Sequence, residues 1–289
     1  MGHLTELRKL LDLKLYELLK KGDCCVAFSA GVDSTLVLKA ACIQAQKLGR
    51  TVYAVTFQTM LHPKADKELA LKLAEAYGAK PEILEVNEYE ILQILENPPD
   101  RCFYCKDHLF AALKQFAQEK GCASVLDGTN ADDKKVFRPG LMALDKNGII
   151  SPLAECGITK KQVRELAAEL DLETASRPSS PCLATRLPYG THLEKKLLER
   201  IESGEYFMQT LGFDASRLRI HGNVARIEVN PEDFEQLLLH REALVSGLKA
   251  LGFVYITLDL QGLRSGSMDE VLSEELKAAL IVSKGWGEN

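Results

Sequence analysis

The chain has 289 residues, of which 46% are hydrophobic and 27% are charged, with a formal net charge of −5. This length allows two domains or one large domain, and the composition is ordinary for a soluble globular protein. The acidic balance disfavours a nucleic-acid partner, and no apolar run reaches the roughly 20 residues that a membrane span needs. The N-terminal stretch has the mixed charges of an amphipathic helix and not of a signal peptide, so we expect a cytoplasmic protein.

Strands and helices alternate along the first part of the chain. Short apolar runs predict buried strands at 24–28, 51–57, 81–86 and 123–127. Helical periodicity and end signals predict helices at 4–21, 34–48, 63–77, 88–96, 105–120 and 159–170. This alternation predicts an α/β fold with a doubly wound parallel sheet, in which ligands bind at the carboxyl ends of the strands.

A Pro- and Ser-rich stretch at 176–192 indicates a hinge. We therefore expect a first domain over 1–186 and a smaller α+β domain over 187–289. The pattern of the second domain predicts a helix at 193–212, two strands joined by Gly222-Asn223, a helix at 231–252 and a strand at 254–260.

The sequence VAFSAGVDS at 26–34 connects the first strand to the first core helix. Ser29 and Ala30 are small, Gly31 can adopt a positive φ, and Asp33 and Ser34 suit the start of a helix. A helix N-terminus offers backbone N–H groups and a favourable dipole to a phosphate or pyrophosphate. The serine hydroxyls can donate to the phosphates, and Asp33 is placed to hold a magnesium ion. An ordinary strand–turn–helix is the alternative interpretation.

The cysteines give a second candidate site. Cys102 and Cys105 form a C-x-x-C sequence in a predicted loop, which suits a redox pair, half a metal site or a coincidence. Cys182 also lies in a loop, near Arg177 and Arg186, whose charges favour a thiolate. Three converging cysteines suit a [4Fe–4S] cluster with one iron free of protein ligands. Alternatively, Cys182 is a lone reactive thiol and the C-x-x-C pair is structural.

Other polar groups extend the candidate site. The stretch GTNADD at 128–133 follows the fourth strand, and its carboxylates can support magnesium or contact a ribose, although such residues are also common in turns. Arg138 can supply a guanidinium to a phosphate. In the second domain Arg217 and Arg219 alternate along one predicted strand, and Glu228 is expected across the turn on the same face. Paired arginines bind phosphate or carboxylate, but a solvated strand face has the same pattern.

The loop SAGVDS resembles the SGGVDS motif of the PP-loop ATP pyrophosphatases, with Ala30 in place of the first family glycine. Those enzymes cleave ATP to AMP and pyrophosphate. The chain is similar to the LarE family of ATP-dependent sulfur transferases in this loop and in six further stretches. These are GTNADD, RPG, SPLAECGITKKQVRELA, PSSPCLATRLPYG, RIHGNVARIEV and LDLQGLRSGSMDE. The similarity runs from the first helix to about residue 270. It implies an adenine nucleotide alpha hydrolase-like (HUP) fold for the first domain.

The resemblance implies that a carboxylate of a nicotinate-derived mononucleotide is adenylated and then converted to a thiocarboxylate, for the nickel-pincer cofactor of lactate racemase. The sulfur comes either from Cys182 itself or from sulfide carried by a [4Fe–4S] cluster on Cys102, Cys105 and Cys182. The resemblance also implies a sulfur donor and a homo-oligomer. Asp33 and Cys182 are then the catalytic residues, with Mg²⁺ on Asp33. The expected ATP-binding residues are Ser29, Ala30, Gly31, Val32, Asp33, Ser34, Thr56, Phe57, Gly128, Asn130 and Arg138. The expected substrate-binding residues are Arg186, Arg217, Arg219 and Glu228.

Two other functions fit parts of the sequence. A PP-loop enzyme that thiolates tRNA has the same loop, but the acidic balance and the lack of an RNA-binding appendage argue against it. A non-enzymatic nucleotide- or metal-binding module is the other alternative. ATP turnover with the mononucleotide, and not with tRNA, distinguishes the three.

Overall fold

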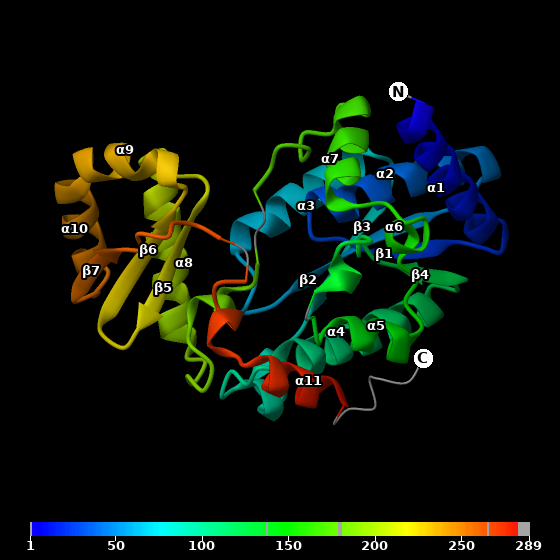
Figure 1. The fold of residues 1–289 in the computed structure, drawn as a ribbon. Coiled ribbons are helices and arrows are strands. Elements are labelled where there is room, and N and C mark those ends of the chain that lie inside the picture. The colour runs from blue at the N-terminus through cyan, green and yellow to red at the C-terminus, as the bar shows by residue number, and fades with distance from the viewer. Residues whose placement is uncertain (1, 137, 179–180, 265, 283–289) are drawn as a thin grey trace. The chain divides into compact units, whose positions relative to one another are not determined.

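The computed structural model describes residues 2–136, 138–178, 181–264 and 266–282 (Figure 1). The chain divides into two compact units. The first comprises Met1–Thr59, Lys64–Ile91 and Asp100–Ser179, and the second comprises Met60–Pro63, Leu92–Pro99 and Ser180–Asn289. The two short segments of the second unit that interrupt the first were not predicted from the sequence. The assignment of separate functions to 1–186 and 187–289 stays a prediction.

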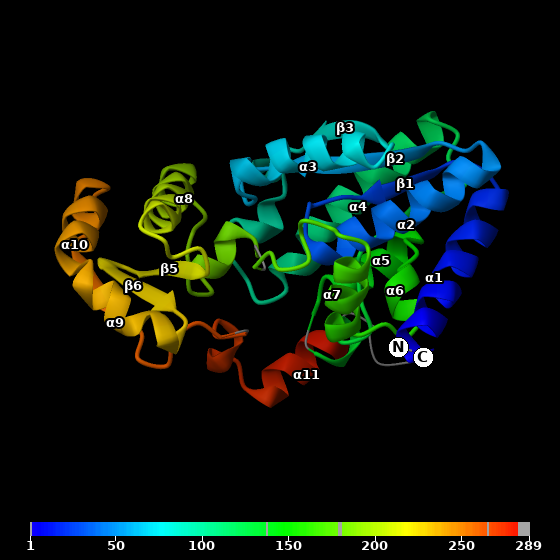
Figure 2. The same cartoon turned by 90° about the horizontal axis from the view of Figure 1, so that it is seen from above.

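The first unit contains a parallel sheet with helices on both faces (Figures 1 and 2). The strand order is β3-β2-β1-β4, and all three neighbouring pairs are parallel. The strands are β1 (Cys24–Ala27), β2 (Val52–Gln58), β3 (Lys80–Glu85) and β4 (Ser124–Leu126). The helices on one face are α1 (Gly2–Lys20), α2 (Val32–Leu48), α3 (Lys64–Ala76), α6 (Pro152–Glu155) and α7 (Lys160–Glu169), and those on the other are α4 (Arg101–Glu119) and α5 (Leu141–Asn147). The predicted α/β class is therefore confirmed.

Alternate residues of β1 point into two separate cores. Cys24 and Val26 lie in the core formed with α1, α2, α3 and α7, whereas Cys25 lies in the core formed with α4 and α5. Successive side chains of a strand point to opposite faces, so a strand buried on both faces is apolar throughout. This explains why the continuous apolar runs identified the strands of this unit.

Three predicted helix boundaries differ in the structure. Helix α4 begins at Arg101, so the C-x-x-C sequence lies in its first turns and not in a loop. Helix α2 begins at Val32, with Gly31 as its N-cap. The predicted helix at 88–96 consists of two 3₁₀ turns, Glu88–Glu90 and Leu92–Ile94. The helix predicted at 159–170 is confirmed as α7, and Thr159 and Gln162 form a capping box at its start.

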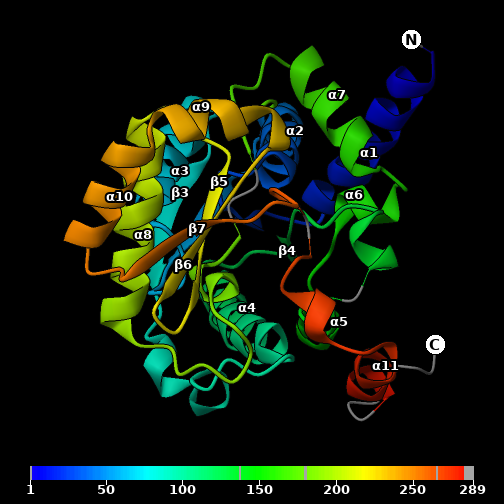
Figure 3. The ribbon, with the colours of Figure 1, turned by 60° about the vertical axis from the view of Figure 1, so that its left-hand side comes forward.

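The second unit contains a three-stranded sheet in the order β5-β6-β7 (Figure 3). β5 (Ser216–His221) and β6 (Val224–Val229) form the predicted antiparallel pair, and β7 (Tyr255–Leu258) is parallel to β6. Helix α8 packs closely on β5, because a Cβ atom on its Gly204 would lie 2.5 Å from Leu218. The helices are α8 (Lys195–Thr210), α9 (Phe234–Leu239), α10 (Arg241–Ala250) and α11 (Glu274–Val282).

The predicted single helix at 231–252 is broken in the structure. A 3₁₀ turn at Pro231–Asp233 precedes α9, and His240 separates α9 from α10. Helices α5, α6 and α11 were not predicted. Among the described helices, none has both the length and the apolar character needed to cross a membrane.

Candidate functional site

The loop after β1 takes its sharp turn at Ala30. Ala30 has φ +53°, in the left-handed region, whereas Gly31 has φ −78° and ψ 156°. The prediction that Gly31 supplies the positive φ is therefore wrong. The position that resembles a family glycine is the one that needs left-handed backbone, and alanine adopts it at a cost of roughly 1–2 kcal/mol.

The two serines of the loop brace it internally. The Ser29 backbone N–H donates to Ser34 Oγ at 3.3 Å, and Ser34 Oγ donates to the Gly31 carbonyl at 3.1 Å. The two hydroxyls lie 3.2 Å apart. Thr56, at the end of β2, donates to the Phe28 carbonyl at 2.8 Å and fixes the start of the loop. These bonds hold both hydroxyls at the N-terminus of α2, where the first backbone N–H groups have no partner within the helix.

Asp33 lies at the centre of the loop site. Its carboxylate accepts a hydrogen bond from the Asn130 amide at 3.1 Å and forms an ion pair with the Lys160 ammonium group. Gly128 packs against the same helix turn, since a Cβ atom there would lie 2.6 Å from the Ser34 backbone nitrogen. The structure thus brings together Asp33, Gly128 and Asn130, as the strand-end argument predicts.

The cations around the loop come from separate segments. Arg177 donates to the Ala30 carbonyl at 2.9 Å and so contacts the strained residue directly. Arg138 is half-exposed and pairs with Asp133 at 2.8 Å, and Asp133 in turn accepts from the Asn130 backbone N–H at 3.1 Å. These groups supply positive charge and hydrogen-bond donors around the N-terminus of α2.

Phe57, a predicted ATP residue, lies on the face of the sheet that α4 covers. Its ring packs edge-on against Phe110, with ring centroids 6.4 Å apart. The Phe57 side chain therefore belongs to a core contact, and an ATP-binding role for Phe57 stays a prediction.

The C-x-x-C cysteines differ in their surroundings. Cys102 is partly exposed and accepts a hydrogen bond from the buried Arg101 guanidinium at 3.4 Å. Cys105 is buried and donates to the carboxylate of the equally buried Glu88 at 3.2 Å. Positions three apart share a helix face, so both sulfurs lie on one side of α4.

Cys182 begins a short 3₁₀ turn, Leu183–Arg186, in the second unit. Its carbonyl accepts from the Thr185 hydroxyl at 2.8 Å, and its side chain is partly exposed. Arg186 is 1% exposed and forms a bidentate pair with Glu205, both distances being 2.8 Å. The same guanidinium donates to the Pro181 carbonyl at 2.8 Å. Arg186 therefore anchors the backbone that carries Cys182 to helix α8.

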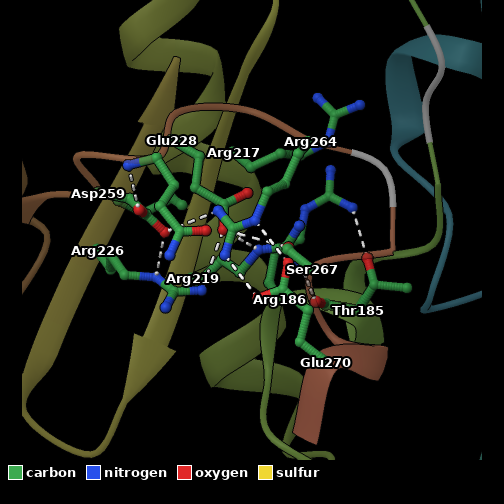
Figure 4. Close-up of polar contacts among 12 residues, drawn as sticks. Thr185, Arg186, Arg217, Arg219, Arg226, Glu228, Asp259, Arg264, Ser267 and Glu270 are labelled. Carbon is green, nitrogen blue, oxygen red and sulfur yellow. Dashed lines mark hydrogen bonds and ion pairs between the residues drawn. The ribbon is translucent and has the colours of Figure 1, made fainter. Parts of the chain in front are cut away.

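A network of arginines and carboxylates occupies one face of the β5–β6 pair (Figure 4). Glu228 is fully buried and accepts from Arg219 at 2.6 Å and from Arg226 at 3.0 Å. Arg219 also donates to the Thr185 carbonyl, which ties this face to the Cys182 turn. Asp259 pairs with Arg264 at 3.2 Å and lies 3.5 Å from Arg226. The cross-strand register confirms that Arg217, Arg219 and Glu228 share a face.

The electrostatic balance of this network is positive around Arg217. Burial, followed by the charge of Arg186, lowers the pKa of Arg217 to about 10, so its guanidinium is still charged at neutral pH. Burial and then the charges of Arg226 and Arg219 lower the pKa of His221. A bound anion would relieve this repulsion between cations. The second acceptor oxygen of Glu228, Oε2, has no hydrogen-bond partner among the described residues.

The described part of the chain contains no group of three or more His, Cys, Asp or Glu side chains arranged to hold a metal ion. Cys102 and Cys105 belong to the first unit and Cys182 to the second. The donor set around Asp33 suits a polyphosphate with a hard cation, because it combines hydroxyls, N–H groups, ammonium and carboxylate. For an iron–sulfur cluster, Cys105 would first have to lose its hydrogen bond to Glu88.

Several residues of these sites were not named as candidates from the sequence. Lys160 lies within SPLAECGITKKQVRELA and Arg264 within LDLQGLRSGSMDE, two stretches noted for family resemblance. Asp259 lies in the same stretch as Arg264. Glu205 carried no signal, because an isolated acid in an amphipathic helix is normally solvent-exposed. Their roles depend on contacts between residues distant in the sequence.

The fold and the loop together define an α/β protein with a polar strand-to-helix turn at the carboxyl end of a parallel sheet, where ligands of such folds bind. No family model matches the chain. It is 37% identical over 250 residues to the pyridinium-3,5-bisthiocarboxylic acid mononucleotide synthase of Lactiplantibacillus plantarum, covering 86% of this chain and 90% of that protein. The chain therefore belongs to the LarE family of these synthases.

Two uncharacterized relatives extend the comparison. One from Synechocystis is 36% identical over 251 residues, covering 86% of this chain and 92% of the relative. One from Methanocaldococcus jannaschii is 30% identical over 261 residues, covering 90% of this chain and 98% of the relative.

Proposed function

We propose that the protein is an ATP-dependent sulfur transferase that converts a carboxylate of pyridinium-3,5-biscarboxylic acid mononucleotide to a thiocarboxylate. Family membership supports an enzyme of this class. Two observations support the proposal: the hydroxyls, amide, ammonium and carboxylate gathered around Asp33 at the start of α2, and a buried arginine network beside the Cys182 turn. Adenylation suits this chemistry because a carboxylate is a poor electrophile, whereas an acyl adenylate has AMP as its leaving group.

At the loop, ATP phosphates are proposed to bind the N-terminus of α2 and the hydroxyls of Ser29 and Ser34. The Lys160 ammonium group is close enough to this turn to pair with Asp33, and we propose that it contacts the phosphates when ATP is bound. Asp33 would hold Mg²⁺, which neutralises charge on the departing pyrophosphate. Asn130 orients the Asp33 carboxylate through its amide. The loop is thus proposed to act as a PP-loop of the ATP pyrophosphatase type.

In the second unit, Arg217 and the neighbouring network are proposed to bind the anionic groups of the mononucleotide. The buried and repelled guanidinium of Arg217 gains most from an anion. Glu228 is completely buried, so we propose that it positions the Arg219 and Arg226 guanidinium groups and does not contact the substrate. Because the Arg186 guanidinium is directed to Glu205 and the loop carbonyls, we propose that it positions Cys182 and does not contact the substrate.

Cys182 is the proposed centre of sulfur transfer. It either gives up its own sulfur or joins Cys102 and Cys105 as a ligand of a [4Fe–4S] cluster. Such a cluster would supply an open iron position for a sulfide. In either route the protein's own contribution is the same: the Thr185 and Arg186 hydrogen bonds fix the backbone from which the Cys182 thiol projects. A homo-oligomer, a sulfide or other sulfur donor, and lactate racemase as the final client stay predictions.

The test is pyrophosphate release from ATP, measured with the mononucleotide, with tRNA and with neither. We expect release only with the mononucleotide. Arg217→Ala should raise KM for the mononucleotide at least tenfold and leave KM for ATP unchanged. Arg241→Ala, a surface arginine of the same unit whose side chain is 74% exposed, is the matched control and should leave both unchanged.

The other outcomes contradict the proposal in different ways. Release stimulated by tRNA alone would identify a tRNA thiolation enzyme. ATP binding without cleavage under any condition would indicate a non-enzymatic module. Equal effects of Arg217→Ala and Arg241→Ala would remove the β5–β6 face from the substrate site.

A further inference from the structure

Two thiols outside the proposed site lie in direct contact. The sulfur atoms of Cys25 and Cys122 are 3.4 Å apart, and the Cys25 thiol donates to the Cys122 sulfur. Cys25 belongs to β1, whereas Cys122 follows the end of α4. The pair therefore joins two elements that meet only in the folded protein.

The backbone holds both cysteines firmly. Cys25 pairs with Val125 in the β1–β4 register. On the other side, the Cys122 N–H donates to the Ala117 carbonyl at 2.8 Å, and the Ala123 N–H donates to the Asp23 carbonyl at 2.8 Å. The contact between the sulfurs is thus set by sheet and helix-end hydrogen bonds, and not by the side chains alone.

The two thiols have different environments. Cys25 is completely buried, whereas Cys122 is partly exposed. The hydrogen bond from Cys25 lowers the pKa of Cys122, with a smaller contribution from the Lys120 cation and opposition from burial and Asp23. The same hydrogen bond and burial raise the pKa of Cys25. A partly exposed thiol whose pKa is lowered, in contact with a buried thiol whose pKa is raised, is the arrangement of an attacking and a resolving cysteine.

We propose that Cys25 and Cys122 form a reversible dithiol–disulfide site that reacts with peroxides. The Cys122 thiolate attacks one oxygen of hydrogen peroxide, which breaks the O–O bond and gives a sulfenic acid and hydroxide. The Cys25 sulfur then attacks the sulfenic sulfur and forms the S–S bond, and the Cys25 proton leaves with the sulfenic hydroxyl as water. The hydroxide from the first step takes up a proton from the solvent. The sulfurs must move from 3.4 Å to the roughly 2.05 Å of a disulfide. A dithiol reductant reverses the reaction by thiol exchange.

The position of the site connects it to the loop. Cys25 lies in β1, the strand that leads directly into Ser29–Ser34. Cys122 lies just after α4, the helix that carries Cys102 and Cys105. Neighbouring Cys24 points to the opposite face of β1 and packs in the other core. It therefore provides a matched control within the same strand.

The experiment uses the full chain, reduced and then freed of reductant without oxygen. Hydrogen peroxide is added in substoichiometric steps, free thiols are alkylated in acid-quenched samples, and tryptic peptides are analysed by mass spectrometry without reduction. We expect a disulfide between the peptides spanning 22–39 and 121–134, and its loss on adding dithiothreitol. Because the first peptide contains both Cys24 and Cys25, variants assign the link. Cys24→Ser should retain it, and Cys25→Ser and Cys122→Ser should each reduce it at least tenfold.

Three results would overturn the proposal. The first is persistence of the linked peptides in Cys25→Ser. The second is a disulfide between Cys122 and a cysteine other than Cys25. The third is a Cys122 that is still alkylated after peroxide has oxidised Cys102 or Cys182. Far-UV circular dichroism checks that each variant is folded. If Cys25→Ser does not fold, Cys25→Ala, which leaves no polar group in the core, takes its place.

Discussion

The buried pair of Arg186 and Glu205 leads to a quantitative prediction for the second unit. The two side chains are 1% and 10% exposed and make two bonds of 2.8 Å. The Leu218 backbone N–H also donates to Glu205 at 2.9 Å. Glu205→Ala would leave the Arg186 guanidinium buried without a counter-charge and Leu218 without its acceptor. Breaking a buried pair in this way costs about 3–5 kcal/mol.

The assay is urea unfolding of the full chain under reducing conditions, followed by far-UV circular dichroism. With a slope of about 1–3 kcal/mol per molar urea, the transition of the second unit should move to lower urea by roughly 1–5 M. Glu242→Ala is the control, because Glu242 and Arg241 form an exposed pair of the same unit, at 3.6 Å, and such pairs contribute about 0–1 kcal/mol. Equal midpoints for the two variants would refute the assignment of Arg186 as a buried anchor.

Four further predictions concern the two proposed sites. Asp33→Asn should abolish pyrophosphate release while the circular dichroism spectrum is retained, and retained release would argue against a magnesium role. Lys160→Ala should lower that rate by roughly 10²-fold or more, whereas Lys161→Ala, at an 85% exposed side chain, should not change it. Cys182→Ala should abolish thiocarboxylate formation but still release pyrophosphate; thiolated product would exclude Cys182 from both sulfur routes. Ala30→Gly should leave stability equal or higher, because relief of the left-handed backbone offsets the entropy of glycine, and a clear loss would contradict the strain.

The two sulfur routes are separated by analysis of the protein itself. An iron content of about four per chain after anaerobic purification would support the cluster, provided that the iron is lost in Cys102→Ser or Cys105→Ser. An iron-free active protein that loses about 34 Da from Cys182 after one turnover would support sacrifice of the cysteine sulfur. Cys156→Ser is the control for both measurements, since Cys156 lies in the α1–α2–α7 core.

Patterns local in sequence predicted most of the fold. The strands of the parallel sheet were recognisable because burial on both faces makes them continuously apolar, and the hairpin because Gly222-Asn223 suits a two-residue turn. The start of α4 was missed although Asp100, a suitable N-cap residue, follows two prolines. The three-residue spacing of C-x-x-C is compatible with one face of a helix as well as with a loop, so it does not distinguish the two.

The candidate sites were predictable only where strand ends bring residues together. Asp33 and Asn130 both follow strands of one parallel sheet, so their contact followed from topology. Lys160 contacts Asp33 although the two residues are 127 positions apart in the sequence. Lys160 does not follow a predicted strand, so no local pattern indicated this contact. Likewise, the left-handed φ of Ala30 carries no composition signal, because glycine is the residue that normally marks such a position.

The contacts of Asp33 predict that nucleotide and metal binding at the loop are coupled. In the chain without ligand, the Asp33 carboxylate already has the Lys160 ammonium and the Asn130 amide as partners. A polyphosphate would offer Lys160 more negative charge than one carboxylate does, so the proposed binding of ATP would draw the ammonium group away from Asp33. The Asp33 carboxylate oxygen would then be available to hold the Mg²⁺ that accompanies the nucleotide. Nucleotide and metal should therefore bind with mutual enhancement in the unaltered chain, and this enhancement should shrink in Lys160→Ala, where Asp33 has no ammonium partner to lose.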